Sequence, residues 1–313
     1  MVVISMKSAS QDRREDITPL LAAETRSRLI GFVCVAFTAL GWGLNWPATK
    51  FLLTECPPLS ARGVCGLVAG LVLFGVARFR GETLVAPRHL WGRLAVAALL
   101  NVSAWMGLTT VSMLWLPAGQ AVTLAYTMPV WAALLAWPML GDRPGSRQIA
   151  AIALGICGVV MLVGGAGVSL DAARRPGIAL ALSAAGLFAF GAVLAKRQPI
   201  PLPRVTLVAW QVSIGCIPLL LGGLLFEQTH FDALPLIGWI ALAYTALVSM
   251  GLCYVLWFAA VRRLRPSSAA VGTLLTPVIG VVASSVALGD PLTIRQIVSL
   301  ALVVAGIMFA IKN

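Results

Sequence analysis

The chain has 313 residues, of which 59% are hydrophobic and only 11% are charged, whereas a soluble domain has about 25% charged residues. Its mean hydropathy is +0.94, and apolar runs of about 20 residues, long enough to cross a bilayer as helices, recur along the whole chain. A large soluble domain is thereby excluded. The net charge of +12 indicates membrane topology rather than nucleic-acid binding, because Lys and Arg cluster between the apolar runs while the aromatic residues lie inside them.

The apolar runs, bounded by charges and Gly/Pro breaks, predict an all-α membrane protein of ten helices with short connections. In chain order the predicted spans are residues 29–53, 60–79, 90–113, 117–138, 147–164, 177–197, 204–225, 235–260, 266–288 and 294–311. Residues 1–28 lack the apolar core of a cleavable signal, so we expect a cytosolic tail. The six cysteines show no CxxC spacing and are typical of packing residues, so no metal or other cofactor is expected.

The distribution of basic residues predicts the orientation. Eighteen of the 23 Lys and Arg residues fall in the N-terminal tail, the connections on its side and the C-terminus, and five fall on the other side: Lys50, Arg62, Arg174, Arg175 and Arg295. By the positive-inside rule both termini are cytosolic.

An internal repeat appears when the chain is shifted by 148 residues against itself. The segment "GDRPGSRQIAAIALGICGVVML" from Gly141 then lies over "GDPLTIRQIVSLALVVAGIMFA" from Gly289, and the same shift pairs Gly43 with Gly191 and Pro129 with Pro277. Each copy, residues 29–164 and 177–311, holds five predicted spans. Because five is odd, the second copy enters the membrane in the opposite sense, which predicts inverted repeats of the kind that support alternating access.

This pattern of two five-span copies, each ending in a "GD" turn, "RQI" and a glycine-rich span, resembles the EamA-like family of the drug/metabolite transporter superfamily. The family usually has Gly-Glu at the positions of Gly141-Asp142 and Gly289-Asp290, and Gly-Ser-Asn at the positions of Gly43-Leu44-Asn45. The resemblance implies a transporter and leaves the substrate open, since the family moves amino acids, drugs, nucleotide sugars and other metabolites. Function must therefore be argued from the site.

Charged residues are scarce at depth in the predicted spans. All eleven acidic residues and both histidines fall in tails, connections or helix ends, Glu55 being the one that a shifted boundary would bring inside. Proton relays and cation sites in membranes use such residues, so facilitated diffusion is favoured over proton-coupled export of cationic drugs. Lys50, near one end of the first span, is the basic residue placed deepest; it either snorkels to the outer interface or attracts a carboxylate at the entrance. A neutral or zwitterionic substrate is therefore favoured over a phosphate ester.

Amides, hydroxyls and aromatic rings remain at depth, several of them at helical spacing. On the first span Thr38, Trp42, Asn45 and Thr49 form one stripe, and polar groups in hydrocarbon are costly unless they face protein or a wet cavity. We therefore expect a central cavity between the two copies. The predicted substrate-binding residues are Trp42, Asn45, Asn101, Trp105, Gln120, Thr123, Tyr126, Phe190, Tyr244, Tyr254 and Thr276.

Each of these residues also has a structural interpretation. A Thr hydroxyl can bond the carbonyl three or four residues earlier, and Asn45 or Asn101 can bond a neighbouring helix instead of a substrate. Pro47, Pro129 and Pro277 interrupt backbone hydrogen bonding within spans, either as packing kinks or as bends that move during gating.

The sequence thus predicts a multi-pass carrier of the plasma membrane, specifically a bacterial inner membrane, without enzymatic activity. Its partners are a small-molecule substrate and the bilayer, and a monomer suffices. An aromatic cavity with amides suits neutral, especially aromatic, amino acids, and the resemblance to exporters of that kind favours outward movement. The alternatives are a proton-coupled exporter of drugs or lipophilic cations and a flippase for lipid-like substrates.

Overall fold

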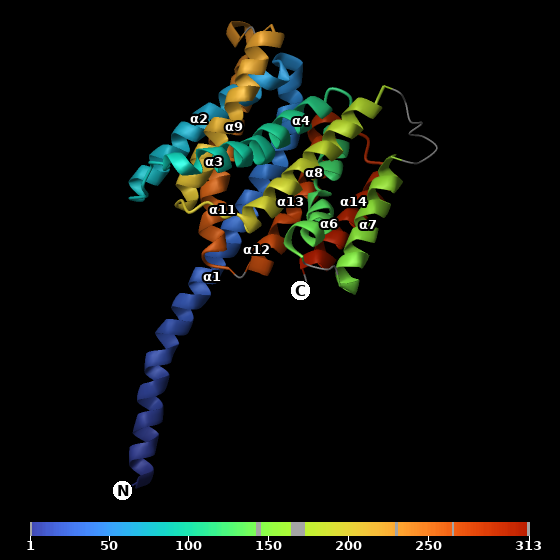
Figure 1. Cartoon of the computed structure of the whole chain (residues 1–313). Coiled ribbons are helices and arrows are strands. Elements are labelled where there is room, and N and C mark those ends of the chain that lie inside the picture. The colour runs from blue at the N-terminus through green and yellow to red at the C-terminus, as the bar shows by residue number, and fades with distance from the viewer. Residues whose placement is uncertain (1, 142–144, 164–172, 229–230, 265, 312–313) are drawn as a thin grey trace.

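The structure is a computed structural model that describes residues 2–141, 145–163, 173–228, 231–264 and 266–311. Within these ranges every regular element is a helix (Figure 1), and side chains of the first helix are described from Thr25 onward. Some of the charged residues and histidines on which the predictions depend lie outside the described residues: Asp142, Arg143, Asp171, His230, Arg265 and Lys312.

The α-helices, in chain order, are α1 (Val2–Glu55), α2 (Pro58–Phe79), α3 (Trp91–Ala98), α4 (Trp105–Ser112), α5 (Ala118–Ala125), α6 (Met128–Leu140), α7 (Ser146–Val163), α8 (Arg175–Arg197), α9 (Arg204–Phe226), α10 (Leu236–Ala243), α11 (Cys253–Val261), α12 (Pro266–Thr273), α13 (Leu275–Leu288) and α14 (Ile294–Ile311). Two short 3-10 segments, η1 (Arg88–Leu90) and η3 (Phe231–Ala233), precede α3 and α10. Two π-helical segments, η2 (Leu99–Ala104) and η4 (Tyr244–Leu252), join α3 to α4 and α10 to α11.

The prediction of a helical multi-pass membrane protein is confirmed. In the described part of the chain, seven helical stretches are long and apolar enough to cross a membrane: Thr25–Glu55, Pro58–Phe79, Arg88–Ser112, Ala118–Leu140, Arg175–Arg197, Arg204–Phe226 and Leu236–Val261. Three shorter apolar helices, Ser146–Leu162, Leu275–Leu288 and Ile294–Phe309, lie where the sequence predicts the fifth, ninth and tenth spans.

Two of the three prolines that were predicted to interrupt spans lie just after breaks in helices. Pro129 is in the first turn of α6, after Tyr126 and Thr127 have ended α5, and Pro277 is in the first turn of α13, after a break at Leu274. Proline fits the first turn because its missing N–H would have no partner there. Pro47 differs, since α1 continues through it without interruption.

The element bounds recur at the shift found in the sequence. Ser146 and Val163, the ends of α7, correspond to Ile294 and Ile311, the ends of α14. Gly141 and Gly289 end α6 and α13 with φ of 77° and 69°, a left-handed conformation that favours glycine. Segment η2 corresponds to the second part of η4.

The packing of helices follows the same correspondence. Helix α2 packs on its counterpart α9, and α7 packs on its counterpart α14, visible as neighbouring pairs in Figure 1. Helix α1 packs on α13 and α11, and its counterpart α8 packs on α6 and α4. These reciprocal contacts are what two copies related by a two-fold axis produce.

Two carboxylates reinforce the pairing of α2 with α9 at their opposite ends. Glu227, after α9, accepts hydrogen bonds from the backbone N–H groups of Leu59 and Ser60 at 2.9 and 2.8 Å. Glu82, after α2, accepts bonds from the N–H and hydroxyl of Thr206 at 2.9 and 3.1 Å. Each carboxylate satisfies donors in the first turn of the partner helix and complements its dipole.

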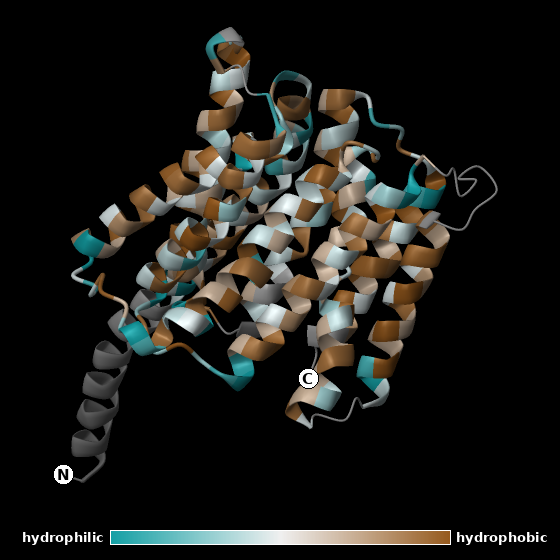
Figure 2. Ribbon diagram, turned by 45° about the horizontal axis from the view of Figure 1, so that its top comes forward, coloured by the Kyte–Doolittle hydropathy of each residue, from teal (hydrophilic) through white to brown (hydrophobic). Residues whose placement is uncertain are grey.

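Large apolar side chains are exposed on the bundle, and brown, hydrophobic segments recur along its helices in Figure 2. Phe37, Leu71, Val160 and Val286 are 60%, 72%, 61% and 82% exposed. Such surfaces are stable in hydrocarbon and unfavourable in water, which agrees with a bilayer surrounding these helices.

Candidate binding cavity

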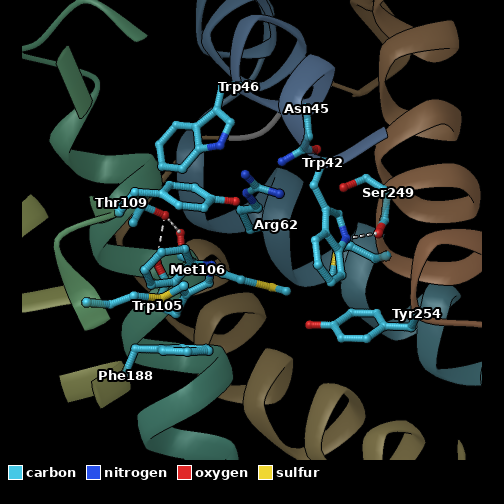
Figure 3. A pocket seen from close by; sticks show the side chains of 13 residues that line it. Trp42, Asn45, Trp46, Arg62, Trp105, Met106, Thr109, Phe188, Ser249 and Tyr254 are labelled. Atoms are coloured by element: carbon cyan, nitrogen blue, oxygen red, sulfur yellow. Dashed lines mark hydrogen bonds between the residues drawn. The ribbon is translucent and has the colours of Figure 1, made fainter. Parts of the chain in front are cut away.

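A cavity of about 140 Å³ lies where helices of both halves meet. Helices α1, α2 and α4 and the break between α5 and α6 contribute from the first half, and α8, η4 and α11 contribute from the second. An apolar protein cavity of about 150 Å³ accommodates benzene, so this one has room for one aromatic ring. Its lining residues are Trp42, Asn45, Trp46, Arg62, Trp105, Met106, Thr109, Tyr126, Met128, Phe188, Ser249, Met250 and Tyr254 (Figure 3).

Aromatic rings form two connected groups around the cavity. Trp105 is the centre of one, with ring centroids 6.4 Å from Tyr126 and 4.8 Å from Phe188. Trp42 belongs to the other, packing edge-on against Tyr254 at 5.6 Å. Rings with this spacing present both faces and edges to a guest, which favours aromatic or aliphatic groups in the space between them.

The π-helical segment η4 positions Trp42. The indole N–H of Trp42 donates to the carbonyl of Ser249 at 3.0 Å, and the hydroxyl of Tyr244 donates back to the carbonyl of Gly41 at 2.8 Å. A π segment changes the backbone hydrogen-bonding register and leaves carbonyls available to such donors. The two bonds connect Trp42 and the residue before it to η4, and the first holds the indole in place.

Arg62 is a buried basic residue on the cavity wall. It was assigned to the side opposite the termini, but it is the fifth residue of α2, is only 7% exposed and lines the cavity. Its Nε donates to the hydroxyl of Thr110 at 2.7 Å, and its Nη2 donates to the hydroxyl of Thr49 at 2.8 Å. Arg62 is therefore a second basic residue inside the helix bundle besides Lys50, and it lies on the cavity wall.

Asn45 lies beside Arg62 on the cavity wall (Figure 3). Its side-chain oxygen is buried and has no hydrogen-bond partner among the described residues. A buried amide oxygen without a donor is destabilising, so Asn45 has an unsatisfied acceptor next to the cavity.

Lys50 lies on α1 beyond the residues of that helix that line the cavity. Its ammonium donates to the carbonyls of Met113 and Leu116, at the end of α4, and it also interacts electrostatically with Asp290. Asp290 accepts a bond from the backbone N–H of Gly119 at 3.2 Å. Lys50 thus contacts the connection between α4 and α5 instead of extending freely into solvent.

The structure brings together five of the eleven predicted binding residues on the cavity wall: Trp42, Asn45, Trp105, Tyr126 and Tyr254. The other six do not line it. Thr123 bonds the carbonyl of Gly119 at 2.8 Å, Tyr244 bonds Gly41, and Phe190 is 38% exposed. Asn101 packs against Gly191, Thr276 is fully buried, and Gln120 is half-buried in α5.

The remaining lining residues were not predicted as binding residues: Trp46, Arg62, Met106, Thr109, Met128, Phe188, Ser249 and Met250. One signal pointed to Arg62, because a cation near a helix N-terminus opposes the helix dipole and requires an explanation. Phe188 and the methionines carry no such signal, since an apolar residue in an apolar helix is compatible with either face. Among the described lining residues none is Asp, Glu or His.

Comparison with other proteins finds membrane transporters similar to this chain. The sequence model of the EamA-like transporter family matches residues 29–164 and 175–312. The chain is 32% identical over 290 residues, 91% of each chain, to the uncharacterized transporter YvbV of Bacillus subtilis (strain 168). It is 31% identical over 291 residues, 90% of this chain and 94% of the relative, to a probable amino-acid metabolite efflux pump of Salmonella typhimurium. A crystal structure with 21% identity, covering 91% of this chain and 96% of its own, superposes with a TM-score of 0.63, which supports the fold.

Proposed function

Because this chain belongs to the EamA-like transporter family and is a multi-pass membrane transporter, we propose that it exports small amphipathic metabolites by facilitated diffusion. Neutral and aromatic amino acids are the proposed substrates. The observation that carries the proposal is the ring-lined cavity between the halves, with Trp105 and Tyr126 on one side and Trp42 and Tyr254 on the other. A relative named as an amino-acid metabolite efflux pump supports the substrate class and the outward direction.

The proposed architecture is ten spans in two inverted copies, residues 29–164 and 177–311, with both termini cytosolic. Reciprocal contacts such as α1 with α13 and α8 with α6 support it. Contacts between connections also support this orientation, because they join residues that it places on the same side of the membrane. Lys50, Leu116 and Asp290 lie together at the end assigned to the outside. Glu82 bonds Thr206 at the end assigned to the inside. Two copies of one shape can then exchange conformations and open the cavity alternately to each side, without enzymatic activity.

The size and charge of the cavity favour small metabolites over the alternatives. Drug-sized ligands occupy pockets of about 300 Å³ or more, whereas this cavity has about 140 Å³. A lipophilic cation or a proton relay calls for a carboxylate at depth, and the described lining residues contain Arg62 instead.

The test is uptake of labelled L-phenylalanine, L-leucine and a cationic dye into proteoliposomes, with and without a pH gradient. We expect phenylalanine and leucine to equilibrate without a gradient, with no accumulation of dye. Accumulation of the dye against a proton gradient without equilibration of amino acids would replace this proposal with proton-coupled cation export.

The aromatic wall has its own prediction within this assay. Trp105→Ala removes the ring between Tyr126 and Phe188, and we expect apparent affinity for phenylalanine to fall about tenfold. Trp137→Ala is the matched control, because Trp137 is 55% exposed on the outside of α6; it should transport as the unmodified protein does. Equal effects of the two substitutions would remove Trp105 from the site.

A further inference from the structure

Arg62 is a buried basic residue to which the proposed function assigns no role. Among the described residues that line the cavity it is the basic one, and Figure 3 shows its guanidinium between Trp42 and Trp46. Two of its five N–H donors are occupied, by the hydroxyls of Thr110 and Thr49. The cavity therefore has donors on one wall and rings on the others.

The surroundings of Arg62 do not neutralise its charge. Both hydrogen-bond partners are neutral hydroxyls, and the titratable groups of the described residues that influence Arg62 are the thiols of Cys65 and Cys216. A buried charge without a counter-ion is strongly unfavourable. An anion that enters the cavity would remove that cost, and transport provides such an anion if the substrate carries one.

The two threonines orient the guanidinium while leaving donors free. Bonds at Nε and Nη2 fix the plane of the group from α4 and α1. The planar fork of Arg fits the two oxygens of a carboxylate. Lys50 is less suited to this role, because it already donates to the carbonyls of Met113 and Leu116 and interacts with Asp290.

We propose that Arg62 binds the carboxylate of the transported substrate, which makes the substrate a monocarboxylate with an apolar or aromatic side chain. This inference rests on the proposed transport function and narrows its substrate class. One unpaired guanidinium balances one negative charge, and the rings of Trp105 and Tyr126 receive the side chain. The free oxygen of Asn45 accepts a hydrogen bond from an ammonium group in those substrates that carry one.

The experiment uses matched ligand pairs with the full-length protein in detergent and in proteoliposomes. Thermal stabilisation and inhibition of phenylalanine counterflow are measured for 3-phenylpropionate against 3-phenylpropionamide, and for L-phenylalanine against L-phenylalaninamide. We expect each carboxylate to bind about tenfold or more tightly than its amide. Comparison of 3-phenylpropionate with L-phenylalanine then separates plain carboxylates from amino acids.

The variants are Arg62→Gln, Arg62→Lys and the control Arg78→Gln, in which an exposed Arg of the same helix is replaced. In Arg62→Gln the preference for carboxylates should fall to about twofold or less, Arg62→Lys should keep part of it, and Arg78→Gln should keep all of it. If Arg62→Gln does not fold, the ligand pairs are measured on the unmodified protein and on Thr110→Val, which removes the hydroxyl bonded to Nε. These measurements still show whether a carboxylate binds more tightly than its amide.

The outcomes separate this inference from the proposed function. Stabilisation by carboxylates that depends on Arg62, without phenylalanine transport, retains the carboxylate site and rejects amino-acid export. Phenylalanine transport inhibited equally by amides and carboxylates retains transport and overturns the role of Arg62. If no carboxylate binds, both are overturned.

Discussion

Asn45 and Asn101 are amides within apolar helices, and the side-chain oxygen of each is buried without a hydrogen-bond partner among the described residues. They differ in what they face. Asn45 lines the cavity, whereas the oxygen of Asn101 would lie 2.2 Å from a methyl group added at Gly191 and so packs against α8. The sequence predicts the same role for both, because each is an amide within an apolar span.

This pair gives a prediction at the scale of single residues. Asn45→Ala should lower transport of phenylalanine several-fold, by the loss of one hydrogen bond to substrate, with nearly unchanged thermal stability because no protein partner is lost. Asn101→Ala is the control and should leave the rate per folded molecule unchanged. Counterflow normalised to folded protein measures both effects, and a reversed order would move the polar contact to Asn101.

At the scale of elements, the crossing of α2 and α9 determines where Arg62 can lie. A methyl group added at Gly63, the residue after Arg62, would be 2.6 Å from the backbone of Leu220, and one added at Gly223 would be 2.7 Å from the backbone N of Ser60. Close approach through small residues is the usual way in which membrane helices pack. The side chain of Arg62 therefore starts from a backbone that is held against its partner helix.

Substitution at this crossing should separate the helices. Gly63→Ala is expected to lower the free energy of unfolding by about 1–3 kcal/mol, because backbone atoms cannot move aside as a side chain would. Gly75→Ala, on the same helix with no atom within 4 Å of the added methyl, should be neutral or slightly stabilising. Thermal unfolding in detergent compares them; equal melting temperatures would mean that the crossing tolerates a wider spacing.

At the scale of the whole molecule, the proposed inverted repeat makes a prediction about sidedness. In a variant with its six cysteines replaced by serine, a membrane-impermeant maleimide added to intact cells should label cysteines introduced at Leu114 and Leu292, and it should spare cysteines at Arg80 and Gln198. All four positions are exposed in connections or at helix ends, so only the side of the membrane distinguishes them. Labelling of the cysteines introduced at positions 80 and 114 from the same side would contradict the antiparallel order of the first half.

The amino-acid sequence was sufficient to predict the class of protein and the approximate positions of its apolar helices, but not the breaks at Tyr126 and Leu274. Hydropathy is a local property, so apolar runs such as residues 60–79 correspond closely to helices such as Pro58–Phe79. The repeat is visible in the sequence because two copies with the same shape keep the same residue at some equivalent positions, as at Pro129 and Pro277. Which side chains share the cavity follows from the packing of the helices. The rotation of each helix depends on its packing against partners far along the chain, and for that reason Arg62 faces the cavity between Thr49 and Thr110 while Phe190 faces outward.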